Sequence, residues 1–135
     1  MEIKKPRPTI DIDSKTYWDA AKNKKLMIQY SLDTKEYFLY SKQLTKSADS
    51  KKVEWREVSG KGKIYSFTLV HAPAGPAFKD ETPYIVASIE LEEGARIISN
   101  VITEHVTNVS IGDRVKVVFE KQDDEFTIPK FEIIK

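Results

Sequence analysis

The chain has 135 residues, of which 40% are hydrophobic and 32% are charged, a composition typical of a globular protein with one ordinary core. Its 22 Lys and Arg residues and 21 Asp and Glu residues leave a net charge of +1, which argues against a general attraction to nucleic acid or to an anionic membrane surface. The absence of cysteine excludes disulfides, thiol catalysis and thiolate metal sites. We expect a cytoplasmic protein, because the sequence has neither a signal peptide nor an apolar run of membrane-spanning length.

The N-terminal segment predicts an extended arm followed by a short helix, because two prolines disfavour helix in the arm. Ser14 is a candidate N-cap, and Asn23 is a plausible end of the helix. Tyr17, Trp18 and Ala21 fall on one face of this helix. The two aromatic side chains can therefore pack on the rest of the chain or anchor a partner.

A strand is predicted at Leu26 to Tyr30, where the sequence reads LMIQY. The segment that follows, from Ser31 to Lys52, is polar apart from the aromatic run at Tyr37 to Tyr40. This segment is too short and too polar to bury itself well.

From Val53 onward the sequence predicts strands that are separated by turns. The predicted strands are 63–71, 84–91, 95–102, 114–120 and 126–134. Strands of this size, with no strong helical pattern among them, favour a mainly β fold with a five-stranded barrel of the OB type.

The residues that most often carry catalysis occur without the partners they need. His71 ends a strand and opens a proline-rich loop, His105 lies in a predicted surface connection, and neither has a second metal ligand at suitable spacing. The adjacent carboxylates Glu92–Glu93 and Asp123–Asp124 lie in turns, where carboxylates are usually solvated. The Gly60-x-Gly62 pair lacks the rest of a nucleotide-binding motif and indicates a hinge or a close backbone approach. We therefore expect no catalytic site.

The aromatic residues allow two interpretations. Trp55, Tyr65 and Phe67 can stack on nucleic-acid bases, as aromatics of OB barrels do, or can form the barrel core. Phe78 differs because it lies in the loop beside Lys79. A loop aromatic flanked by a cation suits a nucleotide-like or acyl ligand.

Several short motifs occur in an order and at a spacing that are typical of one known protein family. The chain resembles the family of zinc-ribbon and OB-fold proteins associated with acyl-CoA metabolism, long catalogued as a domain of unknown function. The matching motifs cover nearly the whole chain and read YWDAAKNKKLMIQY, EWREVSGKGKIYSF, PY at Pro83, ELEEGAR, SN at Ser99, and IG at Ile111 before VKVVF.

The resemblance implies three regions: an arm and helix at 1–25, a degenerate rubredoxin-like zinc ribbon at 26–54, and an OB-fold domain at 55–135. In the family, two C-x-x-C pairs of the ribbon bind zinc. The corresponding positions here are Ser31, Thr34, Thr45 and Ala48, which supply no thiolate. We therefore expect no zinc and a ribbon that folds without metal.

The resemblance also implies a non-catalytic accessory subunit without a tightly bound cofactor. Such a subunit docks on a thiolase-like or hydroxymethylglutaryl-CoA synthase-like enzyme and helps hold a CoA thioester in lipid, isoprenoid or polyketide metabolism. We expect Tyr17 and Trp18 to dock the partner. The residues expected at the acyl-CoA ligand are His71, Phe78, Lys79, Ser99 and Asn100.

The alternative is an OB module that binds single-stranded nucleic acid. The basic residues that favour it are Lys46, Lys51, Lys52, Arg56, Lys61 and Lys63. The near-neutral net charge argues against it.

Overall fold

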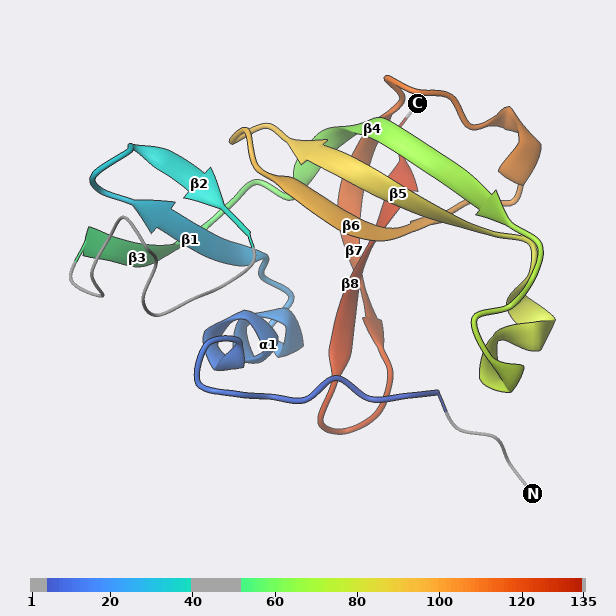
Figure 1. The fold of residues 1–135 in the computed structure, drawn as a ribbon, viewed down its shortest axis with the longest axis horizontal. Coiled ribbons are helices and arrows are strands. Elements are labelled where there is room, and N and C mark those ends of the chain that lie inside the picture. Colours follow the sequence, from blue (N-terminus) through green and yellow to red (C-terminus); the bar gives the residue numbers. More distant parts are fainter. Residues whose placement is uncertain (1–4, 40–51, 135) are drawn as a thin grey trace.

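The computed structural model describes residues 5–39 and 52–134. An N-terminal arm leads into helix α1, which is followed by a small β-sheet and then by a closed β-barrel (Figure 1). Of the predicted fold class, the mainly β content, the short N-terminal helix and the five-stranded OB-type barrel are confirmed. The rubredoxin-like ribbon stays a prediction. None of the helices in the described ranges is long and apolar enough to cross a lipid bilayer.

Helix α1 spans Lys15–Lys22, and Ser14 occupies the N-cap position as predicted. The Ser14 side chain makes no cap hydrogen bond to the helix. Instead the Ser14 amide donates to Asp11 Oδ1 at 2.8 Å, and the amide of Lys15 donates to the Asp11 carbonyl at 3.0 Å. Hydrogen bonds from the side chain and backbone of Ser14 lower the pKa of Asp11. The arm therefore folds back on the start of the helix through Asp11.

The small sheet contains β1 (Met27–Ser31), β2 (Glu36–Phe38) and β3 (Val53–Glu57) in the order β2-β1-β3. Both pairings of β1 are antiparallel. The predicted boundary between residues 54 and 55 falls inside β3, whose Trp55 pairs with Gln29 of β1. Trp55 therefore belongs to the small sheet and not to the barrel.

The barrel is closed in the order β4-β5-β6-β8-β7. Its elements are β4 (Lys61–Val70), η2 (Pro76–Glu81), β5 (Tyr84–Leu91), β6 (Arg96–Ile102), η3 (Val106–Asn108), β7 (Arg114–Lys121) and β8 (Thr127–Ile133). The parallel pairing of β6 with β8 involves Val101 with Phe131, and β4 closes on β7 through Gly62 and Val115.

One core runs through both sheets. Ile28 of the small sheet, with Leu26 and Val58 next to it, belongs to the same buried cluster as Val115 and Phe131 of the barrel. Strict alternation of buried and half-buried residues along β5 supplies one wall of this cluster. The small sheet and the barrel are thus joined by shared apolar packing as well as by the chain.

A β-bulge in β4 corrects one interpretation of the aromatic residues. The register with β5 shifts between Ile64 and Ser66, so Ile64 and Phe67 both contribute to the core although they are three positions apart. Tyr65 at the bulge is 45% exposed, and the Arg96 guanidinium lies 3.6 Å from its ring centroid. The expectation that Tyr65 fills the barrel core is wrong.

The close backbone approach predicted at Gly60-x-Gly62 is confirmed. A Cβ built on Gly62 would lie 2.4 Å from the carbonyl oxygen of Glu90, and one on Gly60 would lie 2.4 Å from Val117 Cγ1. Gly60 also has a φ of +78°. Both strand neighbours of β4 can approach it only because these two positions lack side chains.

Candidate functional site

The loop between β4 and β5 is ordered around the short helix η2. Phe78 lies in η2 with its ring 6.4 Å from that of Tyr84, which begins β5. The Tyr84 hydroxyl accepts a hydrogen bond from the amide of Ala74 at 3.3 Å, and Thr82 Oγ1 donates to the Lys79 carbonyl at 2.9 Å. The loop therefore places an aromatic side chain against the first turn of the following strand.

This loop borders a cavity of about 490 Å³ at the end of the barrel. The loop forms one wall, the ends of β5 and β6 form the next, and β7 and β8 contribute one residue each. The lining residues are Ala74, Phe78, Glu81, Pro83, Tyr84, Ile85, Val86, Asn100, Val101, Ile102, Thr103, Val106, Glu120 and Lys130. A cavity of this size with mostly apolar walls and few polar groups is the usual form of a small-molecule site.

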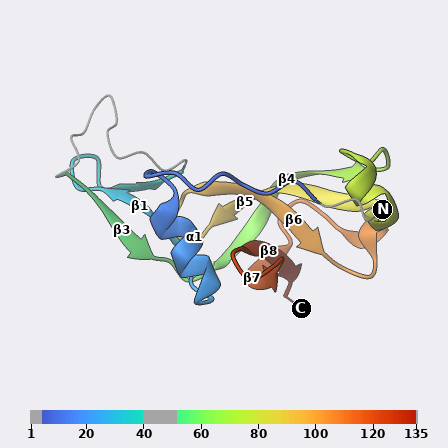
Figure 2. The ribbon, with the colours of Figure 1, turned by 90° about the horizontal axis from the view of Figure 1, so that it is seen from below.

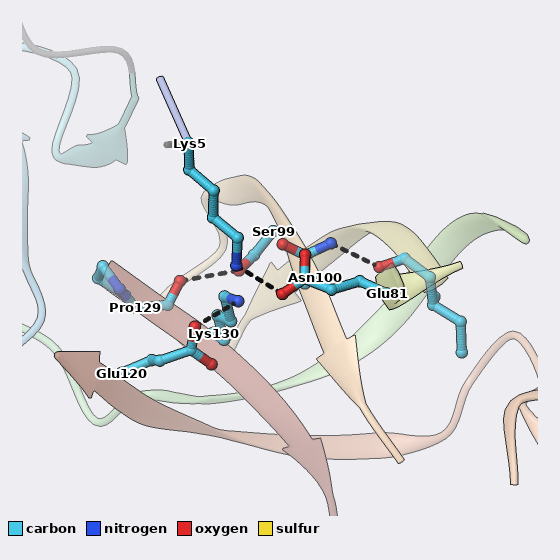
Figure 3. Close-up of polar contacts among 8 residues, drawn as sticks. Lys5, Glu81, Ser99, Asn100, Glu120, Pro129 and Lys130 are labelled. Atoms are coloured by element: carbon cyan, nitrogen blue, oxygen red, sulfur yellow. Dashed lines mark hydrogen bonds and ion pairs between the residues drawn. The ribbon is translucent and has the colours of Figure 1, made fainter. Parts of the chain in front are cut away.

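Two polar contacts organise the inner part of the cavity (Figure 3). Asn100 Nδ2 donates to the carbonyl of Ile85 at 3.0 Å, which joins β6 to β5 through a side chain. Lys130 Nζ lies 2.9 Å from Glu120 Oε1, and the Lys130 side chain is only 14% exposed. Glu120 therefore neutralises the most buried charge of the cavity wall.

The N-terminal arm reaches the rim of the cavity. It runs along the barrel from α1 toward η2 (Figure 2). Lys5 makes an ion pair with Glu81, and its Nζ lies 5.6 Å from the centroid of the Phe78 ring. Arg7 pairs with Asp123 at 3.3 Å and with Glu125 at 2.6 Å, beside the ring of Phe126. Two residues of the arm thus fix it to the η2 loop and to the turn between β7 and β8.

The structure brings together some of the predicted ligand residues. Phe78 and Asn100 line the same cavity. Ser99 donates from its Oγ to the carbonyl of Pro129 at 2.9 Å, a contact between β6 and β8. His71 and Lys79 are exposed and do not belong to the cavity lining.

Sequence reasoning did not identify Lys5, Glu81, Glu120 or Lys130. Each is an ordinary charged residue in its local sequence, and its role at the cavity depends on a contact with a residue at least 10 positions away. The sequence does carry a signal for Tyr84, because this residue begins a predicted strand directly after the loop that carries Phe78.

The predicted docking aromatics pack on the chain itself. The Trp18 ring lies edge-on to the rings of Tyr17 at 5.1 Å and of Phe126 at 5.7 Å. Tyr17 packs against the common core. Both side chains keep part of their surface exposed, so their docking role stays a prediction.

Of the four predicted ribbon positions, two can be placed. Ser31 is buried at the end of β1, and its Oγ accepts a hydrogen bond from the amide of Thr34 at 3.2 Å. The carbonyl of Ser31 accepts from the amide of Lys35 at 2.8 Å, so hydrogen bonds hold this turn. Thr45 and Ala48 lie outside the described residues. In the described part of the chain, no group of three or more His, Asp or Glu residues could hold a metal ion.

The basic residues that favour nucleic acid are largely engaged with carboxylates. Lys52 lies 3.3 Å from Asp33, Lys63 lies 3.8 Å from Glu90, and Arg56 pairs with Glu54 while covering the Tyr30 ring. Lys46 and Lys51 lie outside the described residues. In the described part of the chain, Lys61 is the one member of this set without an ion pair. The set therefore does not form an unpaired basic groove of the kind that tracks a phosphate backbone.

Comparison with known proteins gives a consistent result. A family model described as the C-terminal OB-fold domain of ChsH2 matches residues 55–120. A solved structure entitled "Ltp2-ChsH2(DUF35) aldolase" aligns with a TM-score of 0.82 at 32% identity, over 94% of this chain and 98% of that one.

Two curated relatives match over different lengths. A probable enoyl-CoA hydratase alpha subunit from Thermomonospora curvata is 33% identical over 94% of this chain and 39% of its own length. A DUF35 domain-containing scaffold protein from Methanothermobacter thermautotrophicus is 43% identical over 55% of each chain. The chain thus spans about half or less of these curated relatives.

Proposed function

This chain belongs to the DUF35 family of ChsH2-type OB-fold proteins, and we propose on that basis that it is an accessory subunit of a thiolase-like or synthase-like enzyme. In this role it docks on the partner and helps to hold a CoA thioester. The names of the relatives support an association with enzymes, since one is called a scaffold protein and another an aldolase.

The observation that carries the proposal is the cavity of about 490 Å³ beside Phe78. It offers an apolar chamber with a few hydrogen-bonding groups, which fits a ligand with a long, mostly uncharged arm. The described residues around it include no nucleophile paired with a general base. Holding a thioester for a partner enzyme therefore fits the residues better than independent catalysis.

The proposed docking surface includes α1 and the arm before it. Tyr17 and Trp18 of α1 keep part of their surface exposed, and Ile12, close to the start of the helix, is 73% exposed. Exposed apolar and aromatic side chains on neighbouring segments are the usual elements of a protein contact. Substitution of Ile12 by Glu should weaken the complex and leave the melting temperature unchanged.

Affinity capture from the native host with the tagged full chain tests the partner. We expect a thiolase-like or synthase-like enzyme to co-purify, and the isolated chain to show no thiolase, synthase or hydratase turnover. Ile12→Glu should release the partner, while Ile111→Glu, at an equally exposed site on the barrel, should retain it. Turnover by the isolated chain would contradict the accessory role.

Calorimetry tests the ligand. The double substitution Phe78→Ala with Lys79→Ala should weaken CoA-thioester binding about tenfold, because the aromatic side chain that lines the cavity is lost with Phe78. A parallel titration with a single-stranded oligonucleotide at fixed salt should show no specific binding. Tighter binding of the oligonucleotide than of the thioester would favour the nucleic-acid alternative.

A further inference from the structure

We infer that the cavity beside Phe78 receives the uncharged acyl-pantetheine arm of the thioester, while the phosphate-bearing nucleotide end stays outside. The inference rests on the proposed function and specifies which part of the ligand this chain recognises. Three properties of the cavity carry it: the apolar walls, the pairing of every charged lining residue, and the free hydrogen-bonding capacity of neutral groups.

The walls suit an acyl chain. Apolar side chains or aromatic rings supply most of the lining, and they come from the loop, β5, β6 and η3. These residues are Phe78, Pro83, Tyr84, Ile85, Val86, Val101, Ile102 and Val106. Each methylene that such walls remove from water strengthens binding about three- to fourfold. Affinity should therefore rise with the length of the acyl chain.

The charges of the lining do not suit phosphates. Lys130 is paired with Glu120 at 2.9 Å, and Glu81 is paired with Lys5 of the arm. The lining residues therefore offer no cation without a carboxylate partner, and two of their three charged groups are carboxylates. Phosphate groups need unpaired cations or clustered amide donors, so the nucleotide end would be repelled from this cavity.

Neutral groups in the cavity match the amides of a pantetheine arm. Asn100 uses its Nδ2 for the carbonyl of Ile85, and its Oδ1 makes no hydrogen bond with the described part of the chain, so it can accept from an amide. Thr103 Oγ1 accepts from the amide of His105 at 3.1 Å and keeps its own proton to donate. The Tyr84 hydroxyl likewise accepts from Ala74 and can still donate. One acceptor and two donors on lining residues thus remain for a ligand that carries amide donors and carbonyl acceptors.

An acyl-pantetheine arm has two sources, coenzyme A and an acyl-carrier protein, and the cavity would recognise the shared arm in both. Calorimetry on the full chain with hexanoyl-CoA, S-hexanoyl-pantetheine and adenosine 3′,5′-bisphosphate separates the parts of the ligand. We expect hexanoyl-CoA and hexanoyl-pantetheine to bind within about threefold of each other, with butyryl-pantetheine about tenfold weaker. The bisphosphate should not bind. A hexanoyl-carrier protein that binds more tightly than hexanoyl-CoA would identify the carrier protein as the source.

A matched pair of substitutions locates the site. Ile102 lines the cavity and is 46% exposed, whereas Ile98 on the same strand is 61% exposed and lies outside the lining. Ile102→Arg should weaken hexanoyl-pantetheine binding by tenfold or more, and Ile98→Arg should leave it unchanged, with equal melting temperatures for both variants. Equal binding by both variants would overturn the inference.

The ligand series also separates this inference from the proposed function. If hexanoyl-CoA and the bisphosphate bind while hexanoyl-pantetheine does not, the inference is overturned and the thioester-holding role stands. If neither thioester binds the full chain, the inference is overturned as well, and partner capture alone then decides whether the accessory role stands.

Discussion

Two glycines, one directly before β4 and one within it, are required for different reasons. Gly60 has a φ of +78°, which L side chains rarely adopt, whereas Gly62 lies where a Cβ would meet the Glu90 carbonyl oxygen at 2.4 Å. The obstacle at Gly62 is backbone of the neighbouring strand, so no side-chain rotation can relieve it.

Gly62→Ala should therefore lower the free energy of unfolding by about 1–3 kcal/mol, the range found for overpacked sites. Urea unfolding monitored by tryptophan fluorescence measures the change. Gly75→Ala is the matched control, because a Cβ there meets nothing within 4 Å, and its stability should equal that of the original chain. A Gly62→Ala variant as stable as Gly75→Ala would show that β5 moves aside freely.

Asp123 organises the turn between β7 and β8. Its Oδ1 accepts hydrogen bonds from the amides of Glu125 at 2.7 Å and Phe126 at 3.0 Å. These backbone hydrogen bonds, the one from Glu125 first, together with the charge of Arg7, hold the pKa of Asp123 below its ordinary value of 3.8.

A lowered pKa sets the direction of the pH dependence. The charged form of Asp123 stabilises the folded chain fully above pH 3.8, and this contribution is lost as the pH falls below that value through the folded-state pKa. Asp123→Asn should therefore be less stable than the original chain at pH 7 and should approach it at pH 2–3. Urea unfolding at both pH values measures the difference in free energy of unfolding between the two chains. A difference that is larger in acid than at pH 7 would contradict the lowered pKa of Asp123.

At the scale of elements, helix α1 ends in a Schellman motif with an unusual residue. The amide of Lys24 donates to the Ala21 carbonyl, and the amide of Lys25 donates to the Ala20 carbonyl, both at 3.0 Å. Asn23, the predicted end of the helix, is its C-cap with a φ of −97°. The left-handed position falls on Lys24, whose φ is 59°.

Lys24→Gly should raise the free energy of unfolding by about 1 kcal/mol, because glycine adopts the left-handed conformation without the strain of a Cβ. Thermal unfolding by circular dichroism measures the shift. The control Lys25→Gly, one position further along the chain, should not raise the free energy of unfolding. If both variants melt at or below the original chain, the Schellman geometry is not what limits this helix end.

The elements were predictable to different degrees for physical reasons. Along β5, buried residues alternate with half-buried ones because one face of the strand packs on the core. The same alternation is visible as hydrophobic periodicity in the sequence. The bulge at Tyr65 was not predictable, because it depends on how β4 fits β5 and not on the residues of β4 alone. At the cavity, Phe78 and Asn100 were identified, whereas the Lys5–Glu81 and Glu120–Lys130 pairs depend on three-dimensional closure of the barrel.

At the scale of the whole molecule, the shared core predicts how the chain unfolds. Ile28 of the small sheet is fully buried and belongs to the same cluster as Val115 and Phe131 of the barrel. Arm, helix, small sheet and barrel should therefore unfold in one transition, in which loss of packing at any of them destabilises all.

Ile28→Ala should lower the free energy of unfolding of the entire chain by about 2–5 kcal/mol. Tryptophan fluorescence, which reports on Trp18 and Trp55, and far-ultraviolet circular dichroism, which is dominated by the barrel, should then give coincident transitions shifted by the same amount. The exposed control Ile111→Ala, at 69% exposure, should change neither. Separate transitions for the two probes would show that the small sheet folds independently of the barrel.

The turn after β1 should hold its shape without metal, because Ser31 and Thr34 supply no thiolate and hydrogen bonds hold their turn. EDTA should therefore leave the melting curves of the original chain and of these variants unchanged. A melting temperature that shifts on addition of the chelator would show that metal still contributes to the stability of the small sheet.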